Sequence, residues 1–201
     1  MRRLVVATTN QGKLKEIGRL LEGAPIDLVT LADYPPVRPP EETGKTFAEN
    51  AQLKALFYAK HTGELTVAED SGLEVDALDG APGVESARFG GADATYPQKF
   101  ALLYDALRRK RTATSTARFV CALALAKDGD VLFHTHGTVE GEIASEPRGT
   151  GGFGYDPIFW YPPYGCTLAE AGERKAAVSH RGEAFRKLRD YLATQKAGRA
   201  G

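Results

Sequence analysis

The first 31 residues combine two strand patterns with one helix pattern, and this order constrains the fold more than any other feature. Residues 2–8 contain the continuous apolar run Leu4-Val5-Val6-Ala7, which is typical of a strand buried on both faces. A helix pattern follows, in which apolar residues recur every three or four positions: Leu14, Ile17, Leu20 and Leu21. Residues 26–31 then return to a strand pattern. Because a helical crossover joins parallel strands, the chain is predicted to be an α/β protein.

The rest of the chain continues this mixture. Further helices are predicted where apolar residues recur at helical spacing, over residues 46–61, 95–109 and 182–195. Further strands are predicted at 114–126, 131–144 and 158–161, and Asp128-Gly129 is typical of a hairpin turn. Segments rich in Pro or Gly, residues 34–44 and 149–157, are predicted to be loops.

Charge and composition exclude several classes of protein. Lys and Arg together number 26, as do Asp and Glu, so the bulk charge argues against a general binder of nucleic acid or membrane surfaces. No apolar run approaches the roughly 20 residues of a membrane span, and the two cysteines do not form a disulfide pattern. We therefore expect a cytoplasmic protein with one domain over residues 1–196 and a disordered tail at 197–201.

Two adjacent carboxylates lie at the centre of the sequence. Residues 65–68 have a strand pattern, Glu69 and Asp70 follow, and Ser71-Gly72 separates them from a second strand pattern at 73–76. The pattern predicts an acidic hairpin. Two neighbouring acids repel each other, so a cation, a proton or solvent has to compensate them. A catalytic or metal-binding pair and a solvated turn are both compatible with these residues.

A polar turn joins the first strand to the first helix. It consists of Thr8, Thr9, Asn10, Gln11, Gly12 and Lys13. The first backbone N–H groups of a helix have no intrahelical partner and lie at its positive pole, so such a turn can bind an anion. Lys13 would add a full charge, although a capped helix with a solvated lysine has the same pattern. The turn is not a Walker A loop, because its lysine is followed by Leu14.

Carboxylates near the predicted second helix could hold a metal ion. Glu42 precedes the helix, and Lys54 lies within it. Mg²⁺ is commonly held by one or two carboxylates together with substrate phosphates, so Glu42 and Asp70 are candidate ligands. Glu49 forms a capping box with Thr46 and is assigned a structural role. Lys54 could contact a phosphate or be an ordinary exposed lysine.

Two further segments combine charge with glycine or aromatic residues. Around Phe153, glycines would let a flat ligand approach the backbone, and Asp156 precedes a proline; a loop whose Phe fills the core is the alternative. Lys175, His180 and Arg181 lie at the start of the last predicted helix, where positive charge opposes the helix dipole. A ligand rich in acceptors would relieve that conflict. By contrast, two histidines at 134 and 136 have no evident third ligand and are predicted to be surface or cleft residues.

These motifs together resemble the inosine triphosphate pyrophosphatase family, also called XTP/dITP diphosphatases. In chain order they are Thr8-Thr9-Asn10-x-x-Lys13, Glu42-Thr43-Gly44-x-Thr46-Phe47-x-Glu49-Asn50, Glu69-Asp70-Ser71-Gly72-Leu73, Ala81-Pro82-Gly83, Ser86-Ala87-Arg88, Gly151-Gly152-Phe153-Gly154-Tyr155-Asp156-Pro157 and Ser179-His180-Arg181-Gly182. Each motif alone is weak, but seven in order are specific and span nearly the whole chain.

The resemblance implies an elongated central mixed sheet flanked by helices, with two lobes and a cleft between them, and a homodimer. It implies Mg²⁺-dependent hydrolysis of ITP, dITP and XTP to the monophosphate and pyrophosphate, without nucleic acid or membrane partners. Asp70 would be the base and, with Glu42, a metal ligand. Substrate would be bound by Thr8, Thr9, Asn10, Gln11, Gly12, Lys13, Lys54, Ser71, Phe153, Gly154, Tyr155, Asp156, Lys175, His180 and Arg181.

Three residues depart from the family pattern, and two other functions remain open. Glu69 stands where many members have Asp, Glu85 where an aromatic residue is common, and Lys99 where Asn is frequent. The alternatives are a pyrophosphatase for other modified nucleotides and a nucleotide-binding regulator without turnover.

Overall fold

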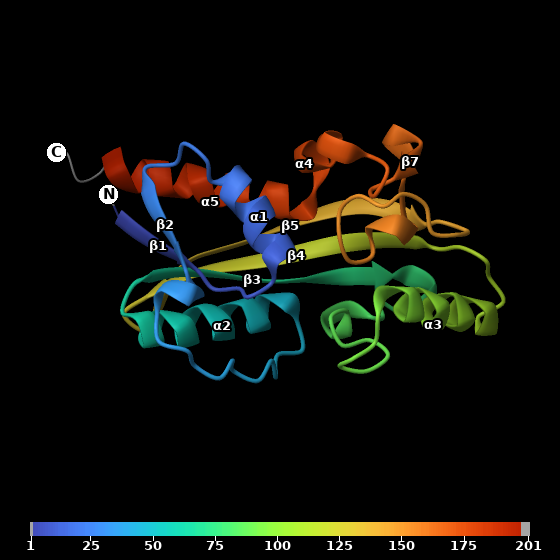
Figure 1. The fold of residues 1–201 in the computed structure, drawn as a ribbon, viewed down its shortest axis with the longest axis horizontal. Coiled ribbons are helices and arrows are strands. Elements are labelled where there is room, and N and C mark those ends of the chain that lie inside the picture. The colour runs from blue at the N-terminus through green and yellow to red at the C-terminus, as the bar shows by residue number, and fades with distance from the viewer. Residues whose placement is uncertain (1, 198–201) are drawn as a thin grey trace. The chain divides into compact units, whose positions relative to one another are not determined.

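The computed structural model describes residues 2–197, which form an α/β fold (Figure 1). Within these residues seven strands form one mixed sheet in the order β2-β1-β3-β4-β5-β6-β7. The strands are β1 (Arg2–Val6), β2 (Ile26–Thr30), β3 (Leu65–Val75), β4 (Thr116–Lys127), β5 (Asp130–Ile143), β6 (Phe159–Tyr161) and β7 (Cys166–Thr167). The helices are α1 (Gln11–Leu20), α2 (Phe47–Thr62), α3 (Tyr96–Arg109), α4 (Lys175–Val178) and α5 (His180–Ala197). The predicted mixed sheet with flanking helices is confirmed, while residues 198–201 of the predicted tail lie outside the described residues.

The predicted parallel strand-helix-strand opening is also confirmed. β1 pairs in parallel with β2, where Leu4 lies beside Leu28, and in parallel with β3, where Leu4 lies beside Leu65. Helix α1 begins after Asn10, whose side chain accepts a hydrogen bond from the Lys13 backbone N–H at 3.1 Å. This N-cap fixes the polar turn at the end of β1.

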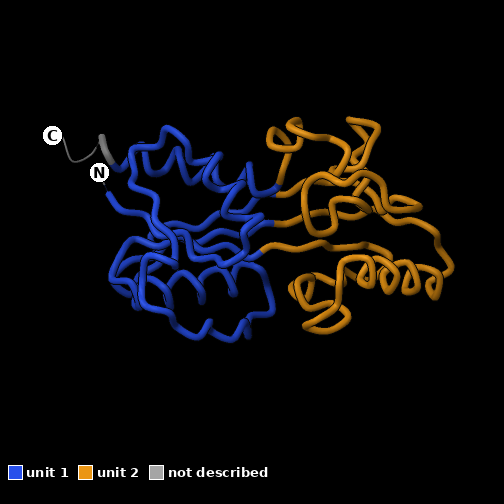
Figure 2. Tube along the Cα trace, in the orientation of Figure 1, with its two compact units in different colours: residues 1–70, 121–137, 180–201 blue, residues 71–120, 138–179 orange. Residues whose placement is uncertain are grey.

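The described residues form two compact units, each with its own core (Figure 2). Of the described residues, unit 1 comprises 2–70, 121–137 and 180–197, and unit 2 comprises 71–120 and 138–179. Strands β3, β4 and β5 each contribute residues to both units. The prediction of a single domain stays a prediction.

Unit 1 is built as a sheet between two helical layers. Helices α1 and α5 lie on one face of β1 and β3, and α2 lies on the other (Figure 1). Apolar side chains of β1, α1, β3, β4 and α5 form its main core, which includes Leu4, Ile17, Val67 and Phe185. The continuous apolar run of β1 is buried on both faces, as predicted.

Unit 2 has a second core around the later half of β3 and the first residues of β4. Leu73, Leu103, Phe119 and Phe159 are among its buried residues. Tyr155 joins this core and donates its hydroxyl hydrogen bond to the backbone oxygen of Ser86 at 2.9 Å. The glycine-rich loop is therefore tied to unit 2 by an aromatic residue.

The predicted acidic hairpin is wrong, because β3 runs without interruption from Leu65 to Val75. Gly72 does not make a turn. It allows a close approach instead, since a Cβ there would lie 2.4 Å from Ser86 Oγ and 2.7 Å from the Gly83 oxygen. Helix α5 begins at His180, two positions before the predicted start.

The membrane prediction can be compared with the helices directly. Among residues 2–197, no helix combines the length and the apolar composition that a membrane crossing needs.

Candidate functional site

The two adjacent carboxylates of β3 point to opposite faces of the sheet. Successive side chains of a strand alternate between faces, and here Glu69 meets residues of α1 and α5 while Asp70 meets residues of α2. Figure 1 shows these helices on opposite sides of β3. Each carboxylate is paired with its own cation, Lys13 on one face and Lys54 on the other. The two adjacent carboxylates therefore belong to two separate clusters of charged residues, one on each face of the sheet.

On the α2 face, Lys54 brings two carboxylates to one point. Its Nζ lies 2.9 Å from Asp70 Oδ1 and 2.7 Å from Glu42 Oε1. Asn50, one helical turn earlier on α2, donates from Nδ2 to Asp70 Oδ2 at 3.2 Å. Both oxygens of the Asp70 carboxylate are thus held, and this fixes its orientation.

Burial and the neighbouring charges together set the pKa values of Asp70 and Lys54. Because burial disfavours the charged form, it raises the pKa of Asp70, even though the nearby Lys54 ammonium opposes the shift. Burial by itself would lower the pKa of Lys54, but the charges of Asp70 and Glu42 outweigh it and raise that pKa. Lys54 consequently stays charged while Asp70 becomes a stronger base than an exposed aspartate.

Helix α2 also positions the loop that carries Glu42. Thr46 and Glu49 form the predicted capping box, in which the Glu49 backbone N–H donates to Thr46 Oγ1 at 3.2 Å and Thr46 N–H donates to Glu49 Oε2 at 3.1 Å. Asn50 Oδ1 accepts the backbone N–H of Gly44 at 2.8 Å. A Cβ at Gly44 would lie 2.6 Å from that Oδ1, so only glycine fits this approach. The assigned structural role of Glu49 is therefore consistent with its hydrogen bonds.

The Glu42–Asp70 pair is suited to a divalent cation. Both carboxylates reach one ammonium nitrogen, so their oxygens already converge on a single cation position. Across residues 2–197 there is no group of three or more His, Cys, Asp or Glu side chains able to bind a metal. Two carboxylates are nevertheless the donor set that Mg²⁺ uses when substrate phosphates and water complete its shell. The residues present fit that ion.

On the opposite face, Glu69 lies among buried charged groups. Its Oε1 is 2.8 Å from Lys13 Nζ and 3.3 Å from Arg181 Nη2. Its Oε2 accepts a hydrogen bond from the Cys121 thiol at 3.4 Å, and Arg181 also pairs with Glu16 at 2.8 Å. Cys121, predicted to be a core residue, is fully buried and also contacts this carboxylate.

The cations determine the charge of Glu69. Burial alone would raise the pKa of this carboxyl, but the charges of Arg181 and then Lys13 hold its pKa well below its usual range. Burial raises the pKa of the Cys121 thiol well above its ordinary value. Glu69 is therefore a fixed anion, and the thiol beside it is a neutral donor.

The ion pairs of Glu69 predict that the free energy of unfolding decreases at acid pH. Above the ordinary glutamate pKa of about 4.5, Glu69 is ionised in the folded and unfolded states, and its ion pairs contribute fully to the free energy of unfolding. Below that pH the unfolded state takes up the proton first, so the contribution is lost as the pH falls towards the lower folded-state pKa. Urea unfolding between pH 6 and pH 3 should show a shallower pH dependence in Glu69→Gln than in the wild type. Glu173→Gln, at an exposed glutamate, should keep the wild-type slope, and an unchanged slope in Glu69→Gln would refute the assignment.

The polar turn of residues 8–13 lies at the start of α1 in unit 1. Asn10 donates its backbone N–H to Thr8 Oγ1 at 3.2 Å and caps the helix with its side chain. Thr9, Asn10 and Gln11 are exposed, so the turn is open to solvent. Lys13 is the residue that links this turn to Glu69.

Unit 2 contains a second polar cluster, formed by the glycine-rich loop and α4. Asp156 is 2% exposed and accepts the Phe153 backbone N–H at 2.7 Å and Lys175 Nζ at 2.6 Å. The Lys175 ammonium lies 4.7 Å from the centre of the Phe153 ring. Gly152 has a φ of 68°, and a Cβ there would meet Asp156 Oδ2 at 2.1 Å, so this tight turn requires glycine. The loop thus presents a fixed aromatic face with a cation beside it.

The structure brings together some predicted site residues and places others separately. Glu42, Lys54 and Asp70 converge in unit 1, and Phe153, Asp156 and Lys175 converge in unit 2. The other predicted residues lie as follows: His180 is buried at the start of α5, Ser71 follows Asp70 in β3, and Gly154 and Tyr155 belong to the glycine-rich loop.

Sequence reasoning missed two residues with clear contacts. Asn50 is completely buried and holds Asp70, and its position one turn before Lys54 on the same helix face could have indicated this. Glu16 pairs with Arg181, and it lies three positions after Lys13 on α1. The contact of Glu16 is not evident from the sequence, because Arg181 is distant in the chain.

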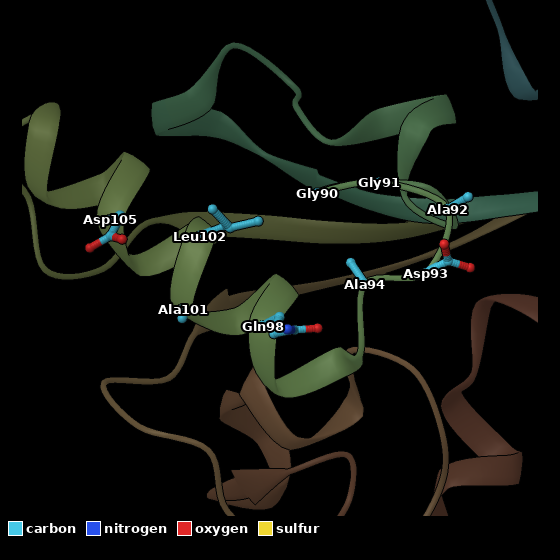
Figure 3. A pocket seen from close by; sticks show the side chains of 9 residues that line it. All are labelled: Gly90, Gly91, Ala92, Asp93, Ala94, Gln98, Ala101, Leu102 and Asp105. Carbon is cyan, nitrogen blue, oxygen red and sulfur yellow. The ribbon is translucent and has the colours of Figure 1, made fainter.

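A cavity of about 630 Å³ lies in unit 2 between α3 and the loop before it (Figure 3). Of the described residues that line it, none is basic and two, Asp93 and Asp105, are acidic. Such a wall offers a polyphosphate no cation. This cavity is not the candidate site.

Known proteins resemble the chain over nearly its full length. Residues 4–191 match the profile of the Ham1 family. A dITP/XTP pyrophosphatase from Geobacter sulfurreducens is 48% identical over 196 residues, which cover 97% of this chain and 98% of that protein. A dITP/XTP pyrophosphatase from Gloeobacter violaceus is 52% identical over 189 residues, with coverages of 94% and 93%. The solved structure of a HAM1 protein from Coxiella burnetii has a TM-score of 0.90 and 41% identity, covering 96% of this chain and 100% of that one.

Proposed function

The chain belongs to the Ham1 family, and we propose that it hydrolyses the deaminated purine nucleoside triphosphates ITP, dITP and XTP to the monophosphate and pyrophosphate. The observation that carries the proposal is the convergence of Glu42 and Asp70 on one cation position at Lys54 Nζ. A pair of carboxylates beside a lysine suits a polyphosphate with a bound divalent ion. The names of the two relatives support the same reaction.

The triphosphate is bound by the turn at the start of α1. The residues that contact it are Thr8, Thr9, Asn10, Gln11, Gly12 and Lys13, with Lys54 and Ser71 as further phosphate contacts. Support comes from the capped helix start, where backbone N–H groups and the positive pole of the dipole favour an anion. The exposure of Thr9, Asn10 and Gln11 leaves the turn accessible.

Asp70 acts as the general base. Its pKa is raised by burial, which strengthens it as a proton acceptor, and Asn50 and Lys54 hold its two oxygens in place. It accepts a proton from the water that attacks the α-phosphorus, and pyrophosphate leaves. Lys54 stays protonated beside it and offsets negative charge on the phosphates.

Glu42 and Asp70 would hold Mg²⁺. When bound, this ion neutralises phosphate charge and lowers the pKa of a coordinated water. Asp70 and Lys54 are the residues of this chain that hold and move protons in the step.

The purine is recognised by the cluster of unit 2. Phe153 stacks on the ring, Gly154 and Tyr155 shape the loop, and Lys175 is held by Asp156 as a donor. A 6-oxo purine offers an acceptor to such donors, whereas the 6-amino group of ATP offers another donor. Each buried donor left unpaired costs about 1–3 kcal/mol, so ATP is rejected.

A panel of triphosphates tests this proposal. Pyrophosphate release should be measured for ITP, dITP, XTP, GTP, ATP and modified pyrimidine triphosphates, with Mg²⁺ and with EDTA. We expect kcat/KM for ITP to exceed that for ATP by roughly 10–100-fold per mismatched donor, and no turnover in EDTA. Equal kcat/KM for ITP and ATP would overturn the assignment of the base-binding residues.

The same panel separates the alternative functions. A pyrophosphatase for other modified nucleotides would favour one of the pyrimidine substrates. A regulator without turnover would bind ITP in calorimetry and release no pyrophosphate. We further propose that the enzyme acts as a homodimer in the cytoplasm, which gel filtration with light scattering and cell fractionation would test.

A further inference from the structure

Tyr96 is the first residue of α3, and aromatic and charged neighbours in unit 2 hold its ring in place. The ring meets Tyr155 edge to face, with centroids 5.4 Å apart and planes at 88°, and its centroid lies 6.2 Å from that of Phe100. Lys99 is buried, and its ammonium lies 4.9 Å from the centre of the Tyr96 ring. These contacts fix the ring without enclosing it, since Tyr96 is 38% exposed.

The hydroxyl of Tyr96 lies beside the glycine-rich loop. Gly154 has a φ of 69°, and a Cβ on it would lie 3.6 Å from Tyr96 Oη, which is an ordinary van der Waals distance. Gly154 directly follows Phe153, whose ring has the Lys175 ammonium beside it. Phe153 and Gly154 are both only partly buried. The hydroxyl is therefore one residue away from the aromatic face of the proposed base site.

The chemical state of this hydroxyl suits it to a ligand. Burial raises the pKa of Tyr96, and the charge of Asp156 raises that pKa further, so the hydroxyl stays protonated at neutral pH. Among residues 2–197, no group forms a hydrogen bond with it. The hydroxyls of Tyr104 and Tyr155, by contrast, each donate to a backbone oxygen at 2.9 Å. Tyr96 thus keeps a donor at the edge of the loop that no other described residue uses.

We propose that Tyr96 is a further purine-binding residue, whose hydroxyl donates a hydrogen bond to the base that stacks on Phe153. The inference rests on the proposed function, because it takes the base to lie against Phe153. The ring nitrogens and carbonyl oxygens of a 6-oxo purine are acceptors for such a bond. The ring contacts of Tyr96 fix the position of the hydroxyl before substrate arrives, so little conformational entropy is lost when the bond forms.

Tyr96→Phe tests this bond alone, because it removes one oxygen atom and keeps the ring contacts with Tyr155 and Phe100. KM for ITP should rise about three- to tenfold while kcat stays within about twofold, since one neutral hydrogen bond made equally in the ground state and the transition state has that weight. KM for dITP, which carries the same base, should rise by the same factor. Calorimetry on the full chain should show an equal rise in the Kd of inosine. The Kd of inorganic tripolyphosphate, a probe without a base, should not change.

Tyr104→Phe gives the matched control on the same helix. The Tyr104 hydroxyl donates to the backbone oxygen of Ala144, which is outside the proposed site, so the same chemical change is made away from the base. KM for ITP and the Kd of inosine should stay within about twofold of the wild type in this variant. Thermal melting of both variants verifies that each remains folded.

The outcomes distinguish this inference from the proposed function. If wild-type protein binds tripolyphosphate but not inosine, the proposed base site itself is wrong. If the wild type binds inosine and Tyr96→Phe leaves both its Kd and the KM for ITP unchanged, the contact is refuted and the base site stands. A rise in KM for ITP with none for dITP would assign the hydroxyl to the ribose 2′-OH and refute the contact with the base. An equal loss of tripolyphosphate binding would also refute it, because the substitution would then disturb more than the base.

Discussion

Replacing Asp70 by Asn should lower kcat for ITP by about 100–10,000-fold while the protein remains folded, because the general base is removed. The substitution keeps the shape of the side chain but deletes its charge. An Asn amide would also turn its NH₂ donor towards either Lys54 Nζ or Asn50 Nδ2, which are both donors. Steady-state pyrophosphate release at saturating Mg²⁺ measures the loss, and circular dichroism verifies the fold.

A carboxylate elsewhere in the same segment provides the control. Asp76 follows β3, is exposed, and pairs with Arg118 at 2.9 Å in unit 2. Asp76→Asn makes the same chemical change outside the proposed site, so its kcat should stay within about twofold of the wild type. Near wild-type kcat in Asp70→Asn would mean that Asp70 is neither the base nor an essential ligand.

Replacing Gly137 by Ala should destabilise unit 1 strongly. A Cβ on this β5 residue would lie 2.2 Å from the His180 backbone oxygen and 2.9 Å from the Ala184 nitrogen. Both are backbone atoms of α5, so α5 has to move away from β5. Overpacking of this kind costs about 1–3 kcal/mol, which corresponds to a fall in Tm of roughly 2–12 °C in a chain of this size. The movement would also displace Arg181 from Glu69.

Gly18 gives the matched control for this substitution. It lies inside α1 in the same unit, and a Cβ there would have no atom within 4 Å. Gly18→Ala should therefore raise the free energy of unfolding by roughly 0.5–1 kcal/mol, since alanine favours the helix. Differential scanning calorimetry on both variants should give shifts of opposite sign. If Gly137→Ala melts with the wild type, the close contact between β5 and α5 is not as described.

The sequence predicted those features that depend on local chemistry. The apolar run of β1 and the Thr46–Glu49 capping box each depend on residues a few positions apart, and both were confirmed. The family resemblance was also confirmed, because it depends on the order of many short motifs.

Features that depend on distant partners could not be predicted in this way. Ser71-Gly72 has the composition of a turn, but β3 continues because the glycine admits the side chain of Ser86. Glu69 and Asp70 are neighbours in sequence, and only the alternation of a continuous strand separates them onto two faces. The partners of Arg181 lie on α1 and β3, far away in the chain, so the sequence could not indicate its ion pairs.

The discontinuous make-up of unit 1 has a consequence for biosynthesis. Its core joins Leu4 of the first strand to Phe185 and Leu188 of the last helix. A nascent chain on the ribosome therefore exposes the apolar surfaces of β1 and β3 until α5 has emerged, and closure over such sequence separations is slow. We expect the newly made polypeptide to depend on chaperones more than a protein of equal length with local contacts.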